Sequence, residues 1–464
     1  MNREKQLVKN TLILSIGTFL ARFTSIITLP ILTAFLSKRD YGVYDLLITL
    51  VSLVLPTITL KIDMGIFRFL IDCRGNIRKI QKLITTAYFF IIPMSLIVSF
   101  MAFYFIKASP LTKILIALYF FSEAIWGLTL QIIRGLSKNF FYSIASISNS
   151  IISMILIVLL ISKLRQGING LLIAIILGQL TTVCFLFIIT KLYKYISIHL
   201  FSILELKMVL SYSWPLVPNS LSFWVMNLSD RLIISTILGL EANAVYAVAN
   251  KIPQLFSSMQ GAFVAAWQEN AALYVSDEDV EEYYSKMFDA IFRLLSGIMA
   301  LLIAITPFIF WLLVKGDYDI AYYQMPILFL GMLFLALSSF LGGIYTAHKK
   351  TKNVGITTII AAILNFIINM IFIKNIGLYA ASVSTTISYF FLCIYRMIDI
   401  KSIQKIKYNI EKIILIIFIL ICMCVLCSTK DTKMLLLNAG IGILFSISIN
   451  KNIVKTILVH ILGR

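Results

Sequence analysis

The chain has 464 residues, of which 60% are hydrophobic and 13% charged, and its mean hydropathy is +0.95. Soluble globular proteins carry about 25% charged residues, so this composition excludes a soluble domain and indicates a polytopic membrane protein. The net charge is +19, but the basic residues lie in short segments between apolar stretches, which disfavours nucleic-acid binding.

Fourteen apolar stretches are long enough to cross a bilayer. Helix is the expected element, because a transmembrane β-strand would alternate in polarity over about 10 residues. The first stretch is interpreted as a span and not as a removed signal peptide. In chain order the predicted spans are 10–36, 42–60, 83–106, 113–134, 140–162, 167–189, 209–236, 242–265, 287–314, 321–346, 354–374, 377–397, 410–428 and 433–450.

The basic residues between the spans predict the orientation. With the N-terminus in the cytoplasm, 27 Lys and Arg residues fall in inner segments and the adjoining span ends, 10 fall in outer segments and the adjoining span ends, and the remaining three are Arg22, Arg231 and Lys251. This bias follows the positive-inside rule and predicts fourteen spans with both termini in the cytoplasm. Every predicted outer loop is short, which argues against a membrane enzyme such as a polymerase or ligase, because those carry reactive residues in a large outer loop.

A weak internal repeat divides the chain. Residues 40–44 (DYGVY) follow the first span and residues 242–246 (ANAVY) follow the seventh, at an offset of about 202 residues. The glycines of INGL and NIGL, Gly170 and Gly377, are 207 residues apart. Each repeat holds six spans, so both halves enter the membrane in the same direction and are related by an axis along the membrane normal.

The predicted fold class is therefore all-α, with two six-helix bundles and two appended helices. The bundles are predicted over residues 1–200 and 201–400, and the appended helices over 401–464. Two such bundles leave a cleft between them, and rocking one against the other gives alternating access. Each chain would hold a complete cleft, which predicts a monomer.

A few charged side chains interrupt the apolar stretches. A charge at the bilayer centre costs at least about 2.5–3.5 kcal/mol, so such residues usually line a wet cavity or a pathway. The pattern therefore predicts a protein that moves something polar. The charged residues are Arg22, Glu123, Asp230, Arg231 and Lys251.

Arg22 shares one face of the first span with Thr18 and Ser25. Its guanidinium offers five donors in a planar fork that suits phosphate, and a diphosphate would fit a wet cavity at this depth. The alternative is a structural ion pair with a carboxylate of another span.

Glu123 and Gln131 lie on one stripe of the fourth span. Glu123 is the only acid of that span and is expected either to carry a proton or sodium ion or to pair with Arg22. Gln131 is a candidate substrate-binding residue.

Asn227, Asp230 and Arg231 fall on or near one face of the seventh span. Neighbouring residues on a helix point in different directions, so the acid and the base are expected to serve different partners. Arg231 is expected to reach substrate, as is Asn227, whereas Asp230 is expected to hold Lys251 or Asn250.

Arg68 lies where the second span meets the cytoplasm. It is expected to meet an anionic headgroup at the inner mouth, or to be an ordinary positive-inside charge. The three histidines are scattered, and no metal-binding spacing, phosphate-binding glycine loop or catalytic nucleophile motif occurs. The sequence thus predicts neither a metal, nor a cofactor, nor catalytic residues.

These residues carry a family resemblance over nearly the whole chain. The segments concerned are LSDRL at 228–232, VYAVANK at 245–251, Leu29–Pro30, YGVY at 41–44, and 346–377. Together they resemble the polysaccharide-export and O-antigen-type oligosaccharide flippases of the multidrug/oligosaccharidyl-lipid/polysaccharide exporter superfamily.

The resemblance implies a pair of bundles around a basic central cavity and no enzymatic activity. It implies that the cargo is an undecaprenyl-diphosphate-linked glycan, turned from the inner to the outer leaflet for polysaccharides such as the O-antigen of lipopolysaccharide. It places Arg22, Arg231 and Lys251 in the cavity and Arg68 near its entrance, with ion coupling at Glu123 or Asp230. Expected partners are membrane lipids and a polysaccharide polymerase or glycosyltransferase. A lipid II flippase and a cation-coupled multidrug antiporter remain alternatives.

Overall fold

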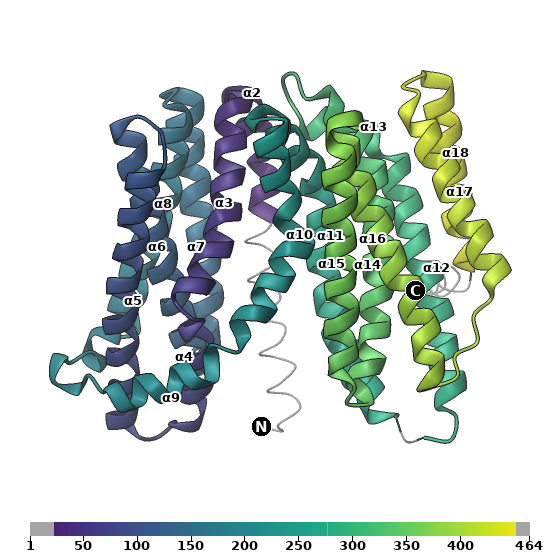
Figure 1. The fold of residues 1–464 in the computed structure, drawn as a ribbon. Helices are drawn as coiled ribbons and strands as arrows, with labels where there is room; N and C mark the ends of the chain where they lie inside the picture. The colour runs from purple at the N-terminus through teal and green to yellow at the C-terminus, as the bar shows by residue number, and fades with distance from the viewer. Residues whose placement is uncertain (1–22, 276, 452–464) are drawn as a thin grey trace, which may run out of the picture. The chain divides into compact units, whose positions relative to one another are not determined.

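The structure, a computed structural model, describes residues 23–275 and 277–451. The regular secondary structure of these residues is entirely helical (Figure 1). Up to Trp224 these residues form one compact unit, unit 1, and from Val225 they form a second, unit 2. The boundary falls inside α10 (Leu216–Ile237).

Unit 1 is a bundle of long helices with shorter elements at both of its ends. The long helices are α3 (Lys38–Ile58), α5 (Ile77–Phe105), α6 (Pro110–Gly135), α7 (Asn139–Ile157) and α8 (Gly167–Ile189). The shorter elements are α2 (Leu29–Phe35), α4 (Ile62–Asp72), the π-helical turn η1 (Val158–Lys163), the 3-10 turns η2 (Leu192–Tyr195) and η3 (Ile198–Leu200), and α9 (Ile203–Ser213).

Side-chain caps define where the helices of unit 1 begin. The hydroxyl oxygen of Ser109 accepts from the Thr112 amide at 3.3 Å, and Pro110 then occupies the first turn of α6. Asn76 caps α5 by accepting from the Lys79 amide at 3.1 Å. Such caps satisfy amides that the helix itself cannot pair, which is why these polar residues stand just before apolar runs.

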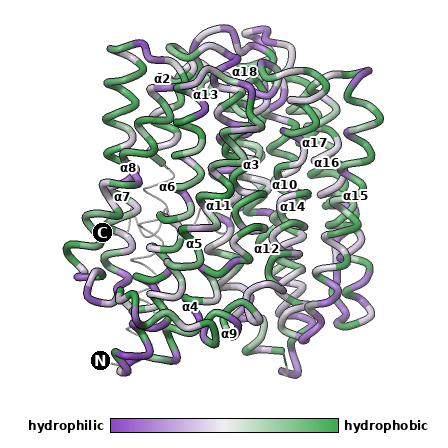
Figure 2. Tube along the Cα trace, turned by 60° about the vertical axis from the view of Figure 1, so that its left-hand side comes forward, coloured by the Kyte–Doolittle hydropathy of each residue, from purple (hydrophilic) through white to green (hydrophobic). Residues whose placement is uncertain are grey.

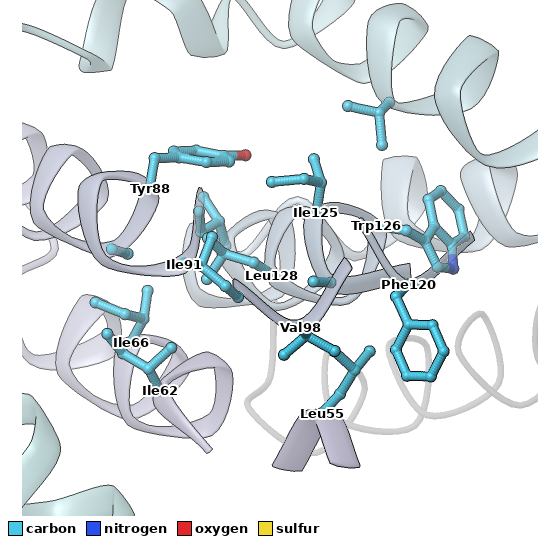
Figure 3. Close-up of a cluster of buried hydrophobic side chains, with 14 of the residues drawn as sticks. Leu55, Ile62, Ile66, Tyr88, Ile91, Val98, Phe120, Ile125, Trp126 and Leu128 are labelled. Atoms are coloured by element: carbon cyan, nitrogen blue, oxygen red, sulfur yellow. The ribbon is translucent and has the colours of Figure 1, made fainter. Parts of the chain in front are cut away.

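The core of unit 1 lies where α4, α5 and α6 meet. Figure 3 shows aliphatic and aromatic side chains from these helices and from α3 gathered in one cluster. The hydroxyls of Tyr88 and Thr129 lie 2.8 Å apart and join α5 to α6. Lipid is as apolar as leucine, so close packing and such interhelical hydrogen bonds hold a membrane bundle together.

Unit 2 is a second bundle, arranged around α14 (Asp319–Ala347), which is buried along most of its length. Its other helices are α11 (Leu240–Leu273), α12 (Val280–Ala304), α13 (Thr306–Leu313), α15 (Thr351–Ile376), α16 (Leu378–Asp399), the 3-10 turn η4 (Ile400–Ser402), α17 (Ile410–Ser428) and α18 (Thr432–Ile449).

Hydrogen bonds from the polar ends of aromatic side chains attach α11 and α17 to α14. The Trp267 indole of α11 donates to the Phe340 carbonyl at 2.9 Å and stacks on the Phe340 ring. The Tyr322 hydroxyl donates to the Cys427 carbonyl at 2.8 Å, which anchors α17. Cys424 and Cys427 are buried free thiols. The α17–α18 pair therefore packs within unit 2 and does not form a separate body.

Eleven helices of the described residues are long and apolar enough to span a membrane. Hydrophobic residues dominate the helices and hydrophilic residues gather toward their ends (Figure 2). The all-α, polytopic prediction is therefore confirmed. Of the first predicted span, 10–36, only the shorter apolar helix Phe23–Phe35 lies within the described residues.

The predicted spans 209–236 and 287–314 are each divided between two α-helices in the structure. The predicted span 209–236 contains the end of α9 and most of α10, which are separated at Trp214–Pro215. α9 runs across the end of unit 1 and packs on α4 and α5 (Figure 1). The predicted span 287–314 is interrupted at Ile305, just before Pro307 in the first turn of α13. Proline cannot continue the hydrogen-bond ladder of the preceding helix, which explains this second break.

Candidate functional site

The Asp230 carboxylate is the centre of a buried polar cluster in unit 2. Its Oδ2 accepts from the hydroxyls of Thr385 at 2.8 Å and Tyr246 at 3.1 Å, and its Oδ1 accepts from Asn369 Nδ2 at 2.8 Å. Asp230 is 4% exposed. Four helices, α10, α11, α15 and α16, therefore converge on one carboxylate that is held by neutral donors.

A second layer of polar groups supports this Asp230 cluster. Asn365 Nδ2 donates to the Thr385 hydroxyl at 3.3 Å, and the Ser384 hydroxyl donates to Asn365 Oδ1 at 3.3 Å. The Asn369 side-chain oxygen is buried and has no hydrogen-bond partner among the described residues. An unsatisfied oxygen beside a buried carboxylate suits a small cation or a proton donor.

The expected partner of Asp230 is corrected by this geometry. Asp230 bonds to neither Lys251 nor Asn250; the Asn250 amide instead donates to the Tyr246 carbonyl at 3.2 Å. Hydroxyl and amide donors from distant helices satisfy the carboxylate, so no ammonium is needed. Arg231, the next residue along α10, is buried, and Lys251 of α11 is partly buried.

Glu123 occupies the middle of α6 in unit 1. Its Oε2 accepts from Gln179 Nε2 of α8, and the Gln179 side-chain oxygen accepts from the Ser122 hydroxyl at 2.7 Å. Its predicted partner Arg22 lies outside the described residues, so the pairing of these two residues stays a prediction. Glu123, like Asp230, is held by a neutral donor.

Glu123 also lines a cavity of about 240 Å³ inside unit 1. The cavity extends along α3 and α6 to the break between α3 and α4, where Lys61 and Asp63 lie. The remaining lining residues are Ile48, Val51, Ser52, Leu55, Pro56, Thr59, Ile91, Tyr119, Ala124, Gly127 and Leu128.

The two predicted polar ligands, Asn227 and Gln131, both have protein partners. Asn227, which lies one turn before Asp230 on α10, accepts a hydrogen bond at its Oδ1 from the Tyr389 hydroxyl at 3.1 Å. Gln131 Oε1 accepts from Arg134 at 3.2 Å, and the Arg134 guanidinium lies 4.6 Å from the centre of the Phe67 ring. Asn227 thus adjoins the Asp230 cluster, whereas Gln131 belongs to unit 1.

Arg68 forms an exposed ion pair with Asp72, one turn along α4. The neighbouring carboxylate raises the pKa of Arg68 above its ordinary value, through a hydrogen bond and direct attraction. Exposed pairs of this kind contribute little to stability, so Arg68 remains available at the end of unit 1.

Arg396 is a buried cation that the sequence analysis did not name as a site residue. It lies on α16, and its guanidinium donates to the Ser338 carbonyl at 2.6 Å, to the Thr357 and Thr358 hydroxyls at 3.1 and 3.0 Å, and to the Val354 carbonyl at 3.2 Å. These bonds fix α14, α15 and α16 together. Its place in the last turn of a predicted span was a signal for this role.

The sequence comparisons give one family over more than half of the chain. The profile of the family described as polysaccharide biosynthesis protein matches residues 7–267, and that of the lipid II flippase MurJ matches residues 323–440. No curated protein sequence gives a significant match.

Solved structures share the fold over most of the chain at low sequence identity. Lipid II flippase MurJ, in an inward closed conformation, matches at a TM-score of 0.69 and 17% identity, over 98% of this chain and 100% of its own. An inward-facing multidrug resistance MATE family transporter of the MOP superfamily matches at a TM-score of 0.68 and 13% identity, over 84% of this chain and 95% of its own. A MOP superfamily transporter from Pyrococcus furiosus matches at a TM-score of 0.55 and 15% identity, over 85% of this chain and 96% of its own.

The descriptions of these matches name flippases and transporters, in agreement with the apolar spans and the polar groups within them. This chain is therefore a multi-pass membrane protein that belongs to the polysaccharide biosynthesis protein family and has the fold of the MurJ and MATE transporters.

Proposed function

We propose that this protein turns an undecaprenyl-diphosphate-linked oligosaccharide from the inner to the outer leaflet of the bacterial plasma membrane by alternating access. The family match over residues 7–267 is the observation that carries the proposal. The product would serve a surface polysaccharide such as O-antigen or capsule. Both termini would lie in the cytoplasm, and a monomer would suffice, working beside a polymerase or glycosyltransferase.

The charge of the chain favours an anionic cargo. Its net charge is +19, and Arg22, Arg231 and Lys251 fall within predicted spans. Two phosphates that enter a medium of low dielectric need compensating charge. We assign this role to Arg22, Arg231 and Lys251, with Arg68 near the inner entrance and Asn227 and Gln131 as polar ligands.

Coupling to an ion is the second part of the proposal. Asp230 and Glu123 accept hydrogen bonds from neutral groups, and neither forms an ion pair with a described residue. Such carboxylates can exchange a proton or a monovalent cation without breaking a salt bridge. The unsatisfied Asn369 oxygen beside Asp230 supports an ion-binding role for that cluster.

A lipid II flippase is the second candidate function. The MurJ profile matches residues 323–440, and the MurJ structure spans nearly the whole chain. Lipid II also carries a lipid diphosphate, so the two candidates differ in the glycan and not in the charge that the protein must neutralise.

Reconstitution with defined cargoes tests these proposals. The purified protein in proteoliposomes receives fluorescent undecaprenyl-diphosphate oligosaccharide, fluorescent lipid II or an organic cation, and protein-free liposomes serve as the control. We expect movement of the oligosaccharide lipid. Movement of lipid II alone would select the second candidate, and efflux of the cation alone would select a multidrug antiporter.

A further inference from the structure

The cavity of unit 1 connects the middle of the bundle to one of its ends. Along α3 it is lined from Ile48 to Thr59, a length of about 16 Å at 1.5 Å per residue. Its volume of about 240 Å³ far exceeds the roughly 10–15 Å³ that one water molecule requires. Water enters cavities that offer polar partners, and here Glu123 lies within the bundle and Lys61 and Asp63 lie at the α3–α4 break.

The backbone at the α3–α4 break turns these charged residues toward the cavity. Leu60 and Lys61 are consecutive non-glycine residues with φ of 51° and 55°, a conformation that side chains with a Cβ rarely adopt. The Ser213 hydroxyl of α9 donates to the Leu60 carbonyl at 2.8 Å and holds the turn. Strained turns of this kind persist where the surrounding structure fixes them, often at functional positions.

A proton is the ligand that fits Glu123. The Gln179 amide N–H occupies Oε2, and among the described residues the other oxygen has no hydrogen-bond partner. No cluster of three His, Cys, Asp or Glu side chains that could hold a metal occurs in the described part of the chain. Besides Glu123, the charged and titratable groups that line this cavity are Lys61, Asp63 and Tyr119, and Tyr44 of α3 also lies close enough to interact electrostatically with Glu123.

We propose that this cavity is a water-filled path through which Glu123 exchanges protons with the cytoplasmic side. The path begins at Lys61 and Asp63, at the end of the segment 61–82, whose six basic residues place it in the cytoplasm. This inference rests on the proposed function, in which Glu123 is a coupling carboxylate, and adds the route of the proton and the side from which it comes.

Cysteine accessibility tests the path without any transport assay. Gly127 lines the cavity, and a Cβ at this position meets no atom within 4 Å, so Gly127→Cys places a thiol in open space. Leu118→Cys is the matched control, because Leu118 is an exposed residue of the same helix outside the cavity. A charged methanethiosulfonate reagent is added to inverted or right-side-out vesicles, and labelling is read by mass spectrometry against the unchanged chain.

Only a hydrated thiolate reacts quickly with this reagent. We expect Gly127→Cys to react in inverted vesicles roughly tenfold faster than Leu118→Cys or than Gly127→Cys in right-side-out vesicles. Reaction from the outer side, or reaction no faster than that of Leu118→Cys, overturns the proposal. Because labelling needs no cargo, a failure of the flippase assay leaves this result intact.

Carbodiimide modification of the unchanged chain gives a second readout. Dicyclohexylcarbodiimide reacts with protonated carboxyl groups. The amount of adduct on the peptide that contains Glu123 is measured as the pH is varied. We expect an adduct that decreases as the pH rises and that is absent in Glu123→Gln. An unmodified Glu123 over the whole pH range in which the protein is folded overturns the assignment of Glu123 as the proton site.

Discussion

The Asp230 carboxylate receives three donors from three other helices, so its removal leaves Tyr246, Asn369 and Thr385 without an acceptor. Each buried polar group that loses its partner costs about 1–3 kcal/mol. We expect Asp230→Leu to lower the melting temperature in detergent strongly, and Asp230→Asn to lower it less, because the amide keeps one acceptor oxygen.

The exposed Asp72 supplies the control for this experiment. Asp72→Asn removes an acid of unit 1 that pairs only at the surface and is expected to leave the melting temperature nearly unchanged. Equal melting temperatures for Asp230→Leu and the unchanged chain would contradict a structural role for the Asp230 cluster.

His348, which follows α14, gives a prediction about pH. Burial and the Lys350 cation lower the pKa of His348 below its usual value of 6.5. As the pH falls, His348 therefore takes up a proton in the unfolded chain before it does so in the folded protein. The free energy of unfolding decreases between pH 6.5 and the lower pKa that His348 has in the folded protein. We expect His348→Gln to remove this loss, so that the melting temperatures of the two proteins differ increasingly below pH 6.5. Parallel curves of melting temperature against pH for the His348→Gln variant and the unchanged chain would contradict this prediction.

The sequence predicted the charged residues of the spans but not their partners. Asp230 was recognisable because an acid is rare in an apolar stretch, whereas Asn369 and Thr385 lie 139 and 155 residues away from it. Only the packing of helices brings them together. Asn365 and Asn369, one turn apart in a span, were the available signal that this face of α15 meets a polar partner.

At the scale of elements, the contact of α4 with α9 depends on a glycine. A Cβ at Gly65 would lie 2.7 Å from Val209 Cγ1 and 3.1 Å from the Val209 carbonyl oxygen. We expect Gly65→Ala to push α9 away from α4 and to destabilise the protein by about 1–3 kcal/mol, measured by thermal unfolding in detergent.

Gly355→Ala in α15 is the matched control, since a Cβ there meets no atom within 4 Å. Alanine is a better helix former than glycine by about 0.8–1.0 kcal/mol, so this variant is expected to be at least as stable as the unchanged chain. A Gly65→Ala protein as stable as Gly355→Ala would show that α4 and α9 pack less closely than described.

Hydropathy predicted most of the long helices and was less accurate where helices end. The predicted span 209–236 joined the end of α9 to α10, because Val209 and Leu210 are apolar whether they face protein or lipid. Window averages record how apolar a segment is, whereas the direction of the backbone at Trp214–Pro215 depends on the packing of α9 against α4 and α5.

At the scale of the whole molecule, the length and number of the apolar stretches were enough to predict a polytopic, all-helical membrane protein. The fold shared with the MurJ and MATE structures agrees with that prediction. The division at residues 200 and 400 stays a prediction, and the described residues separate into compact units at Trp224. The glycan stays unassigned, because polar groups that recognise sugars are not distinguishable in sequence from other polar residues of a bundle.

Our central proposal is that basic residues of the predicted spans carry an anionic lipid-linked cargo across the membrane. Its most direct test is the rate of movement of fluorescent undecaprenyl-diphosphate oligosaccharide in proteoliposomes, for Arg22→Gln, Arg231→Gln and the control Lys286→Gln. Lys286 is an exposed cation paired with Glu282, so all three variants lose one charge. We predict at least a roughly tenfold loss, equivalent to about 1.4 kcal/mol in the transport barrier, for both arginine variants and none for Lys286→Gln. Undiminished movement in folded Arg22→Gln and Arg231→Gln proteins would contradict the account.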